Sequence, residues 1–109
     1  IMSTIQNNVQ LIGHLGDDPE EVKFDSNKKL AKFSLATNFR YKNKEGNTVE
    51  NTQWHRIVAW DKLAEVCIAH LKKGSHVACQ GRLEYKDYET KSGEKRHSVE
   101  IHLDDMLML

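Results

Sequence analysis

Short runs of alternating apolar and polar residues, separated by turn-forming residues, restrict the fold of this 109-residue chain more than any other feature. The alternating runs cover residues 8–15, 30–39, 53–60, 77–88 and 99–103. Because successive side chains of a β-strand point to opposite faces, such alternation is typical of strands with one buried face. The sequence therefore predicts five strands, with Val22 to Phe24 as a short extended segment after the first.

One segment between the third and fourth runs has a different period. Its apolar stripe recurs at helical spacing, at Leu63, Val66, Cys67, His70 and Leu71. We expect this helix to span Lys62–Lys73, with Asp61 as its N-cap and Gly74 as the left-handed residue that ends it.

The predicted order is three strands, one helix and two strands. This is the order of an all-β, five-stranded Greek-key barrel of the oligonucleotide- and oligosaccharide-binding (OB) type, with its helix between strands three and four. Gly81 is expected to mark a bulge in the fourth strand, because an isolated glycine in a strand often does. No low-complexity linker interrupts the chain, so residues 6–109 are expected to form a single domain.

Several classes of function are not expected from the composition. No apolar stretch approaches the roughly 20 residues that cross a bilayer, and no basic, apolar leader opens the chain. We therefore expect no membrane partner and a cytoplasmic, nucleoid-associated location. The six histidines lack metal-ligand spacing, and no phosphate-binding loop or nucleophile motif is present, so no metal, no cofactor and no enzymatic activity are expected. Cys67 and Cys79 are interpreted as reduced core thiols.

The charges are segregated although they sum to a formal net charge of zero. Acidic residues gather early in the chain, at Asp17, Asp18, Glu20, Glu21 and Asp25, whereas Arg40, Lys42 and Lys44 stand together with no acid among them. The zero sum argues against a polycation that holds nucleic acid by total charge alone. A solvated surface also carries such runs, so the pattern has to be combined with other signals.

The third predicted strand carries the strongest functional signal. Trp54, Arg56 and Trp60 fall on one face, together with Val58, while His55 falls on the other. Indole rings stack on any nucleobase, and a guanidinium can meet a phosphate or lie on a ring. Two core tryptophans are the alternative, but a core face would not hold an unpaired cation. The face is therefore predicted to bind single-stranded nucleic acid.

Two further segments interleave aromatic and basic residues. In the fourth strand Arg82, Lys86 and Tyr88 share a face, and Tyr88 is either another stacking platform or an ordinary half-exposed strand residue. Arg40 and Tyr41 stand where the second strand enters a long hairpin, and Tyr41 is favoured over Phe39 for contact.

An ordered series of motifs resembles the bacterial single-stranded DNA-binding protein family from residue 8 to residue 109. The motifs that carry this resemblance are Leu11–Gly16, Asp18–Glu20, Phe33–Asn38, Trp54–Arg56, Lys62–Glu65, Lys72–Ser75, Gly81–Leu83 and Met106–Leu109. The resemblance implies binding and protection of single-stranded DNA during replication, recombination and repair, by a homotetramer. It implies base stacking at Tyr41, Trp54, Trp60 and Tyr88, and a subunit contact at His55, for which a plain buried histidine is the alternative. The predicted DNA contacts are completed by Arg56 and by a set of cations, Arg40, Lys62, Lys73, Arg82 and Lys86.

This sequence departs from the family pattern at several points. Tyr41 and Tyr88 stand where tryptophan is common, Trp60 replaces a familiar phenylalanine, and Glu84 and Asp87 set negative charge near the proposed DNA track. The family commonly continues into a tail that recruits replication and repair proteins, so these partners are expected only if such a tail exists in the full-length protein. Two alternatives remain open: an accessory barrel that handles single strands while docking on a helicase, and a barrel whose aromatic face binds a peptide.

Overall fold

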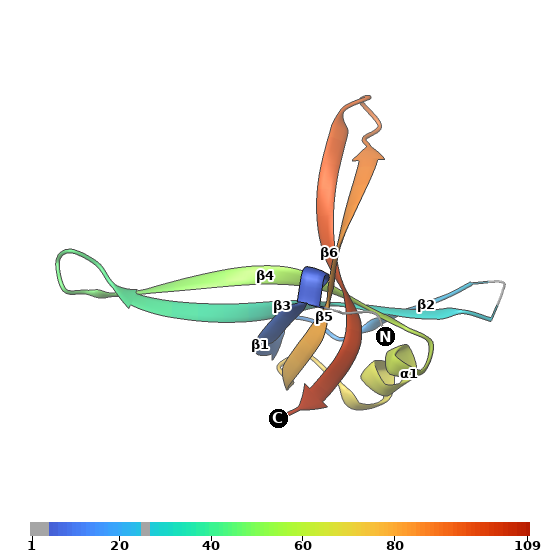
Figure 1. The fold of residues 1–109 in the computed structure, drawn as a ribbon, viewed down its shortest axis with the longest axis horizontal. Coiled ribbons are helices and arrows are strands. Elements are labelled where there is room, and N and C mark those ends of the chain that lie inside the picture. Colours follow the sequence, from blue (N-terminus) through green and yellow to red (C-terminus); the bar gives the residue numbers. More distant parts are fainter. Residues whose placement is uncertain (1–4, 25–26) are drawn as a thin grey trace.

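A computed structural model of the protein describes residues 5–24 and 27–109. The chain begins with a 3₁₀ turn and continues through six strands and one helix (Figure 1). The elements are, in order, Ile5–Asn7 (3₁₀), β1 Val9–Leu15, β2 Glu20–Lys23, β3 Lys29–Lys42, β4 Thr48–Trp60, α1 Asp61–His70, β5 His76–Glu89 and β6 Lys95–Met108.

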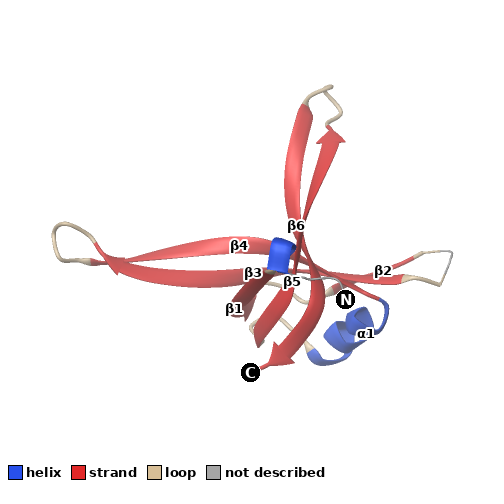
Figure 2. Cartoon of the chain, in the orientation of Figure 1, coloured by secondary structure: helices blue, strands red, loops and turns tan. Residues whose placement is uncertain are grey.

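Five of the strands close into a barrel, and this confirms the predicted OB fold. They are hydrogen-bonded in the order β1-β5-β6-β4-β3, and β3 returns to β1 through the pairs His14↔Ala36 and Leu15↔Leu35. β4 and β6 run parallel at Ile57↔Ile101, as a Greek-key connection requires. The short β2 pairs with β3 as an addition to the barrel. α1 lies between β4 and β5 in sequence and packs against β3 and β4 (Figure 2).

The inward side chains of the strands form one apolar core. Leu35, Ile57 and Val77 are fully buried, and the two thiols, Cys67 and Cys79, are buried and unpaired. Burial raises the pKa of Cys67 to about 11 and that of Cys79 to about 12, because the charged thiolate is penalised in an apolar surrounding. Both thiols therefore remain protonated at neutral pH and serve as core residues.

The helix differs from the prediction at both ends. It ends at His70 rather than Lys73, and Asp61 is its first residue, in the left-handed region at φ 51°, while Trp60 occupies the N-cap without a side-chain hydrogen bond. Gly74 is left-handed at φ 91° but belongs to the turn that follows the helix, where its N–H donates to the carbonyl of Leu15 at 2.9 Å. This hydrogen bond ties the turn to the end of β1, so a tertiary contact replaces a last helical turn.

Two long hairpins continue beyond the barrel and project away from it (Figure 1). We call the outer part of the β3–β4 hairpin, residues 38–52, the β3–β4 arm, and residues 85–99 the β5–β6 arm. The β5–β6 ladder contains a register shift between Gln80 and Gly81, as expected for a bulge. A side chain at Gly81 would clash with the carbonyl of His102, which explains why glycine stands there. In the described part of the chain, no helix is long and apolar enough to cross a membrane.

Candidate nucleic-acid interface

The outward side of β4 presents the residues that the alternation predicted. Trp54 is 63% exposed, Arg56 is exposed and Trp60 is half-buried, whereas Ile57 and Ala59 between them are fully buried. Both indole rings therefore lie outside the hydrophobic core. The face is not uniformly open, however. Val58 shares it but is buried, because Lys32 of β3 and His102 of β6 flank it as register partners on either side.

The Trp54 ring packs against a glycine. The six-membered ring lies directly over Gly16, so that any side chain at this position would overlap the indole. Gly16 follows β1, which meets β3 beside the Trp54 register partner Ala36. The ring is thus packed on backbone on one side and remains available for stacking elsewhere on its surface.

A groove between the bases of the two arms brings three predicted contact residues together. It has a volume of about 370 Å³ and is lined by Trp54 and Arg56 of β4 and by Tyr88 of β5, with His97 and Val99 of β6 among the other walls. Tyr88 is 50% exposed, so its ring is accessible. A groove lined by two aromatic rings and a guanidinium can receive a flat, charged polymer such as unpaired DNA.

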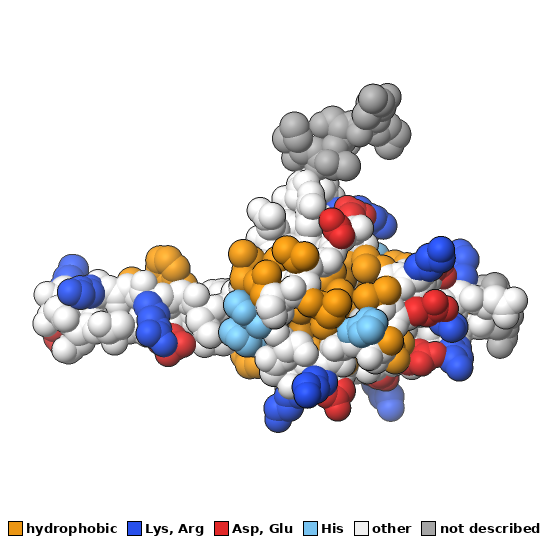
Figure 3. All heavy atoms as spheres, turned by 90° about the horizontal axis from the view of Figure 1, so that it is seen from below, with side chains coloured by type: hydrophobic (Ala, Val, Ile, Leu, Met, Phe, Trp, Pro, Cys, Tyr) orange, Lys and Arg blue, Asp and Glu red, His pale blue; other side chains and the backbone are white. Residues whose placement is uncertain are grey.

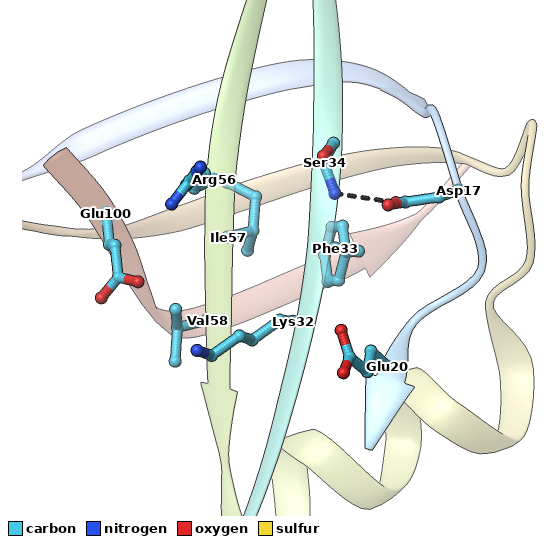
Figure 4. Close-up of a pocket in the computed structure, with 9 residues that line it drawn as sticks. All are labelled: Asp17, Glu20, Lys32, Phe33, Ser34, Arg56, Ile57, Val58 and Glu100. Atoms are coloured by element: carbon cyan, nitrogen blue, oxygen red, sulfur yellow. Dashed lines mark hydrogen bonds between the residues drawn. The ribbon is translucent and has the colours of Figure 1, made fainter. Parts of the chain in front are cut away.

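A second groove, of about 180 Å³, continues from the same arginine along the outer face (Figure 4). Arg56 and Lys32 provide cations, and Val58 and Phe33 contribute apolar surface. Asp17, which also lines this groove, is engaged by the backbone N–H of Ser34 at 3.0 Å. Within the described ranges, no carboxylate forms an ion pair with Arg56, so its charge is available to a ligand at the junction of the two grooves.

Two of the other predicted cations, Arg82 and Lys86, are already paired with carboxylates. Arg82 is paired with Glu84 at 3.0 Å and with Asp104 at 3.3 Å, and Lys86 is paired with Glu100 at 3.2 Å. A phosphate must exchange with these carboxylates; the Arg82 pairs are exposed on both sides and are worth only about 0–1 kcal/mol, whereas the Glu100 partner of Lys86 is buried. The charge of Glu84 is therefore paired with that of its neighbour Arg82 and is not an isolated negative charge.

Several predicted contacts lie elsewhere on the molecule. Tyr41 stacks on Phe39 with ring centroids 6.2 Å apart in the β3–β4 arm, where Arg40 opposes Glu50. The side chains of Lys62, in the first turn of α1, and of Lys73, in the turn after it, are exposed. None of these residues lines either groove, so the structure does not gather them with Trp54.

His55 occupies a half-buried position at the base of the β3–β4 arm. Its Nε2 lies 2.9 Å from the Thr37 hydroxyl, and its side chain lines the groove that holds Trp54 and Tyr88. Burial lowers the pKa of this histidine, because the imidazolium form is penalised by desolvation. His55 is therefore a histidine that the fold favours in its neutral form.

Sequence reasoning missed the partners of Trp60. The ring of Phe24 stacks with this indole at a centroid distance of 6.1 Å and an interplanar angle of 19°. On another side, the Trp60 Nε1–H donates to His102 Nδ1 at 3.2 Å. A half-buried indole N–H needs an acceptor, and that need was the one sequence signal available. It could not indicate which residue would supply the acceptor.

Comparisons with known proteins converge on one family. The model of the single-strand binding protein family matches residues 6–109. Single-stranded DNA-binding protein 1 of Chlorobaculum tepidum is 47% identical over 104 residues, which cover 94% of this chain and 64% of that protein. The single-stranded DNA-binding protein of Xanthomonas campestris pv. campestris is 39% identical over 103 residues, covering 94% and 60%. The chain thus spans less than two thirds of the length of these relatives.

A solved structure gives the same result in three dimensions. The Plasmodium falciparum SSB complex with ssDNA resembles this chain with a TM-score of 0.88 at 31% identity, over 94% of each chain. The similarity therefore extends over nearly the whole barrel and both arms.

Proposed function

Since this chain belongs to the single-strand binding protein family, we propose that it binds and protects single-stranded DNA with little sequence preference, and catalyses no reaction. Residues 6–109 act as one binding domain that serves replication, recombination and repair. The observation that carries the proposal is the groove in which Trp54, Arg56 and Tyr88 meet. The names of the relatives and of the solved ssDNA complex support it.

The proposed mechanism combines stacking with charge. Every base has a π-face, so stacking on Trp54, Trp60, Tyr88 and Tyr41 tolerates any sequence, at roughly 1–3 kcal/mol per base. Arg56 meets the strand where the two grooves join. Phosphates along the rest of the path are neutralised by the remaining predicted cations, Arg40, Lys62, Lys73, Arg82 and Lys86.

We propose further that the protein assembles as a homotetramer. Ile12 of β1, Ala78 of β5 and Leu107 of β6 are register neighbours on the outward side, and Ile12 and Leu107 are 58% and 63% exposed. Figure 3 shows hydrophobic side chains gathered on the underside of the barrel. The face carries no charge at these positions, so two copies can meet without repulsion. Residues 9–13 of β1 pair only with β5 in the described chain, which leaves a strand edge for a second copy. His55 remains a proposed subunit contact.

The location and the protein partners are proposed more broadly. We propose a cytoplasmic, nucleoid-associated protein that recruits replication and repair enzymes only if the full-length chain carries a C-terminal tail. The binding proposed for residues 6–109 does not depend on that tail.

Titration with oligo(dT) tests the binding function. Tryptophan fluorescence should be quenched, and log K should fall with log salt at a slope of about −0.7 per neutralised phosphate. Arg56→Gln should reduce that slope by about 0.7, whereas Lys29→Gln, which changes a lysine bonded to Glu65 of the helix, should leave it unchanged. Absence of both quenching and binding at low salt would overturn the proposal. Capture of a peptide without DNA binding would favour a peptide-binding adaptor. Capture of a helicase by residues 6–109 alone would favour an accessory barrel that docks on a helicase.

Solution mass tests the assembly. Ile12→Glu combined with Leu107→Glu should convert a tetramer into smaller species, because each charge would be buried on assembly. Val66→Glu on the helix is the matched control, since Val66 is 37% exposed and lies outside the proposed face. A monomeric parent protein at micromolar concentration would contradict the homotetramer.

A further inference from the structure

We propose that His102 and Glu100 of β6 are positioning residues for DNA binding, which hold the Trp60 ring ready to stack through a hydrogen-bonded chain. This inference rests on the proposed function, because it assigns a role within the same face. It concerns residues that lie beside the stacking surface and are not themselves expected to touch a base.

The chain of contacts runs inward from the indole. Trp60 Nε1 lies 3.2 Å from His102 Nδ1, and His102 Nε2 lies 3.4 Å from Glu100 Oε1. The same carboxylate oxygen receives Lys86 Nζ at 3.2 Å. Only 8% of His102 and 6% of Glu100 remain exposed, so the contact between these two side chains is largely shielded from water.

The chemistry of the donor groups fixes which ring nitrogen of His102 carries the proton. An indole N–H can only donate, so His102 Nδ1 must be an acceptor and carry no proton. The proton of the neutral ring therefore sits on Nε2, which donates to the carboxylate of Glu100. Burial by itself would raise the pKa of Glu100, but the hydrogen bonds from Lys86 and His102, with the charges of Lys86 and Lys32, lower it overall. Glu100 thus remains an anion and keeps the histidine in the tautomer that Trp60 requires.

These two polar residues are not required by the barrel core. Their neighbours Ile101 and Leu103 point inward and belong to the core cluster, whereas Glu100 and His102 lie on the alternate, outward positions of β6. Figure 4 shows Glu100 on the same side of the groove as Arg56 and Lys32. A buried acid and histidine are costly unless fully hydrogen-bonded, and apolar residues of similar volume would cover Val58 as well. A role in orienting Trp60 accounts for their chemistry.

The consequence for binding is preorganisation. A half-buried ring that is bonded at its N–H and stacked beside Phe24 loses little rotational freedom when a base arrives. Without the acceptor, the indole N–H would have to find water, and the ring would sample other orientations. Affinity for single-stranded DNA should then fall although every stacking ring is still present.

A double-mutant cycle separates positioning from a merely structural role. His102→Leu should weaken binding of a labelled oligo(dT) by roughly three- to tenfold, the effect of one hydrogen bond. In a Trp60→Phe background the same change should have no effect, because phenylalanine has no N–H to hold. His102→Gln should recover part of the affinity, since its amide oxygen can accept from the indole. His70→Leu, on an exposed helix position, is the matched control.

A spectroscopic readout completes the test. In Trp54→Phe protein, Trp60 is the remaining tryptophan, and His102→Leu should increase its quenching by acrylamide before DNA is added. Equal losses of affinity in the parent and in the Trp60→Phe background, or no loss in either, would overturn the positioning role. His102→Ala provides the same cycle if leucine is not accommodated. Failure of the parent protein to bind oligo(dT) would instead refute the proposed function itself.

Discussion

The two faces of β4 differ more than any other neighbouring parts of the molecule. Ile57 and Ala59 point inward and are fully buried, while Trp54 and Arg56 point outward and are exposed. The difference shows that alternate residues of one strand contribute to stability and to the proposed DNA binding. Changes on the inner face should therefore alter unfolding without altering the affinity of folded protein, and changes on the outer face should do the reverse.

The outer face contains a second contrast, between its two tryptophans. Trp54 rests on Gly16 and is widely exposed, whereas Trp60 is half-buried, stacked beside Phe24 and hydrogen-bonded to His102. The first ring depends on the shape of the backbone beneath it, and the second on polar side chains of another strand. The same residue type is thus oriented by two different physical means.

The largest effect is expected from removing both outer-face rings. Trp54→Ala together with Trp60→Ala should lose roughly 2–6 kcal/mol of DNA-binding free energy if each ring stacks one base. Anisotropy of a labelled oligo(dT) measures this loss, since the variant has no tryptophan. Circular dichroism should show that the barrel persists. A folded double variant with parental affinity would break the assignment of binding to this face.

On the inner face, Ile57→Ala should cost about 2–5 kcal/mol of unfolding free energy, because it leaves a cavity in the core. Urea denaturation measures this loss. Val66→Ala, at an exposed helix position, should change stability by less than about 0.5 kcal/mol. At temperatures where the Ile57 variant is folded, its affinity for oligo(dT) should match the parent. A lower affinity of the folded variant would show that the two faces are coupled.

A smaller effect is expected at Gly16, against which the Trp54 ring packs. Gly16→Ala should push the indole away from its present position and weaken DNA binding by at most about 1–3 kcal/mol, the value of one stacked base. Gly16→Ala should cause no such loss of affinity in a Trp54→Ala background, where no ring remains to be displaced. Equal losses in both backgrounds would mean that Gly16 matters for the turn rather than for the ring.

The smallest effect concerns pH. The pKa of His55 is lowered from 6.5 by burial, so the unfolded chain binds a proton at a pH where the folded chain does not. Stability should therefore decline as pH falls below about 6.5, and His55→Asn should flatten this part of the profile. The lowered pKa of Glu100 acts later, because its contribution is lost only as pH falls below the unfolded value of 4.5. A profile unchanged by His55→Asn would contradict the first step.

Much of the fold followed from local patterns. The alternating runs located the five barrel strands, and Gly81 marked the bulge, because strand period and glycine geometry are local properties. The predicted end of the helix, at Lys73, was wrong because the backbone N–H of Gly74 donates to the carbonyl of Leu15, a residue far away in the sequence. The sequence predicts only an extended segment where β2 lies, since the pairing of β2 with β3 is not visible in its own four residues.

The sequence by itself determined which residues of β4 face outward and that they are two indoles with a guanidinium between them, since side-chain direction in a strand follows from position alone. Only the tertiary structure decided what lies around each ring. It placed Gly16 under Trp54, His102 beside Trp60, and Tyr88 in the same groove as Arg56. These neighbours come from strands distant in sequence, and barrel closure sets the register that brings them together.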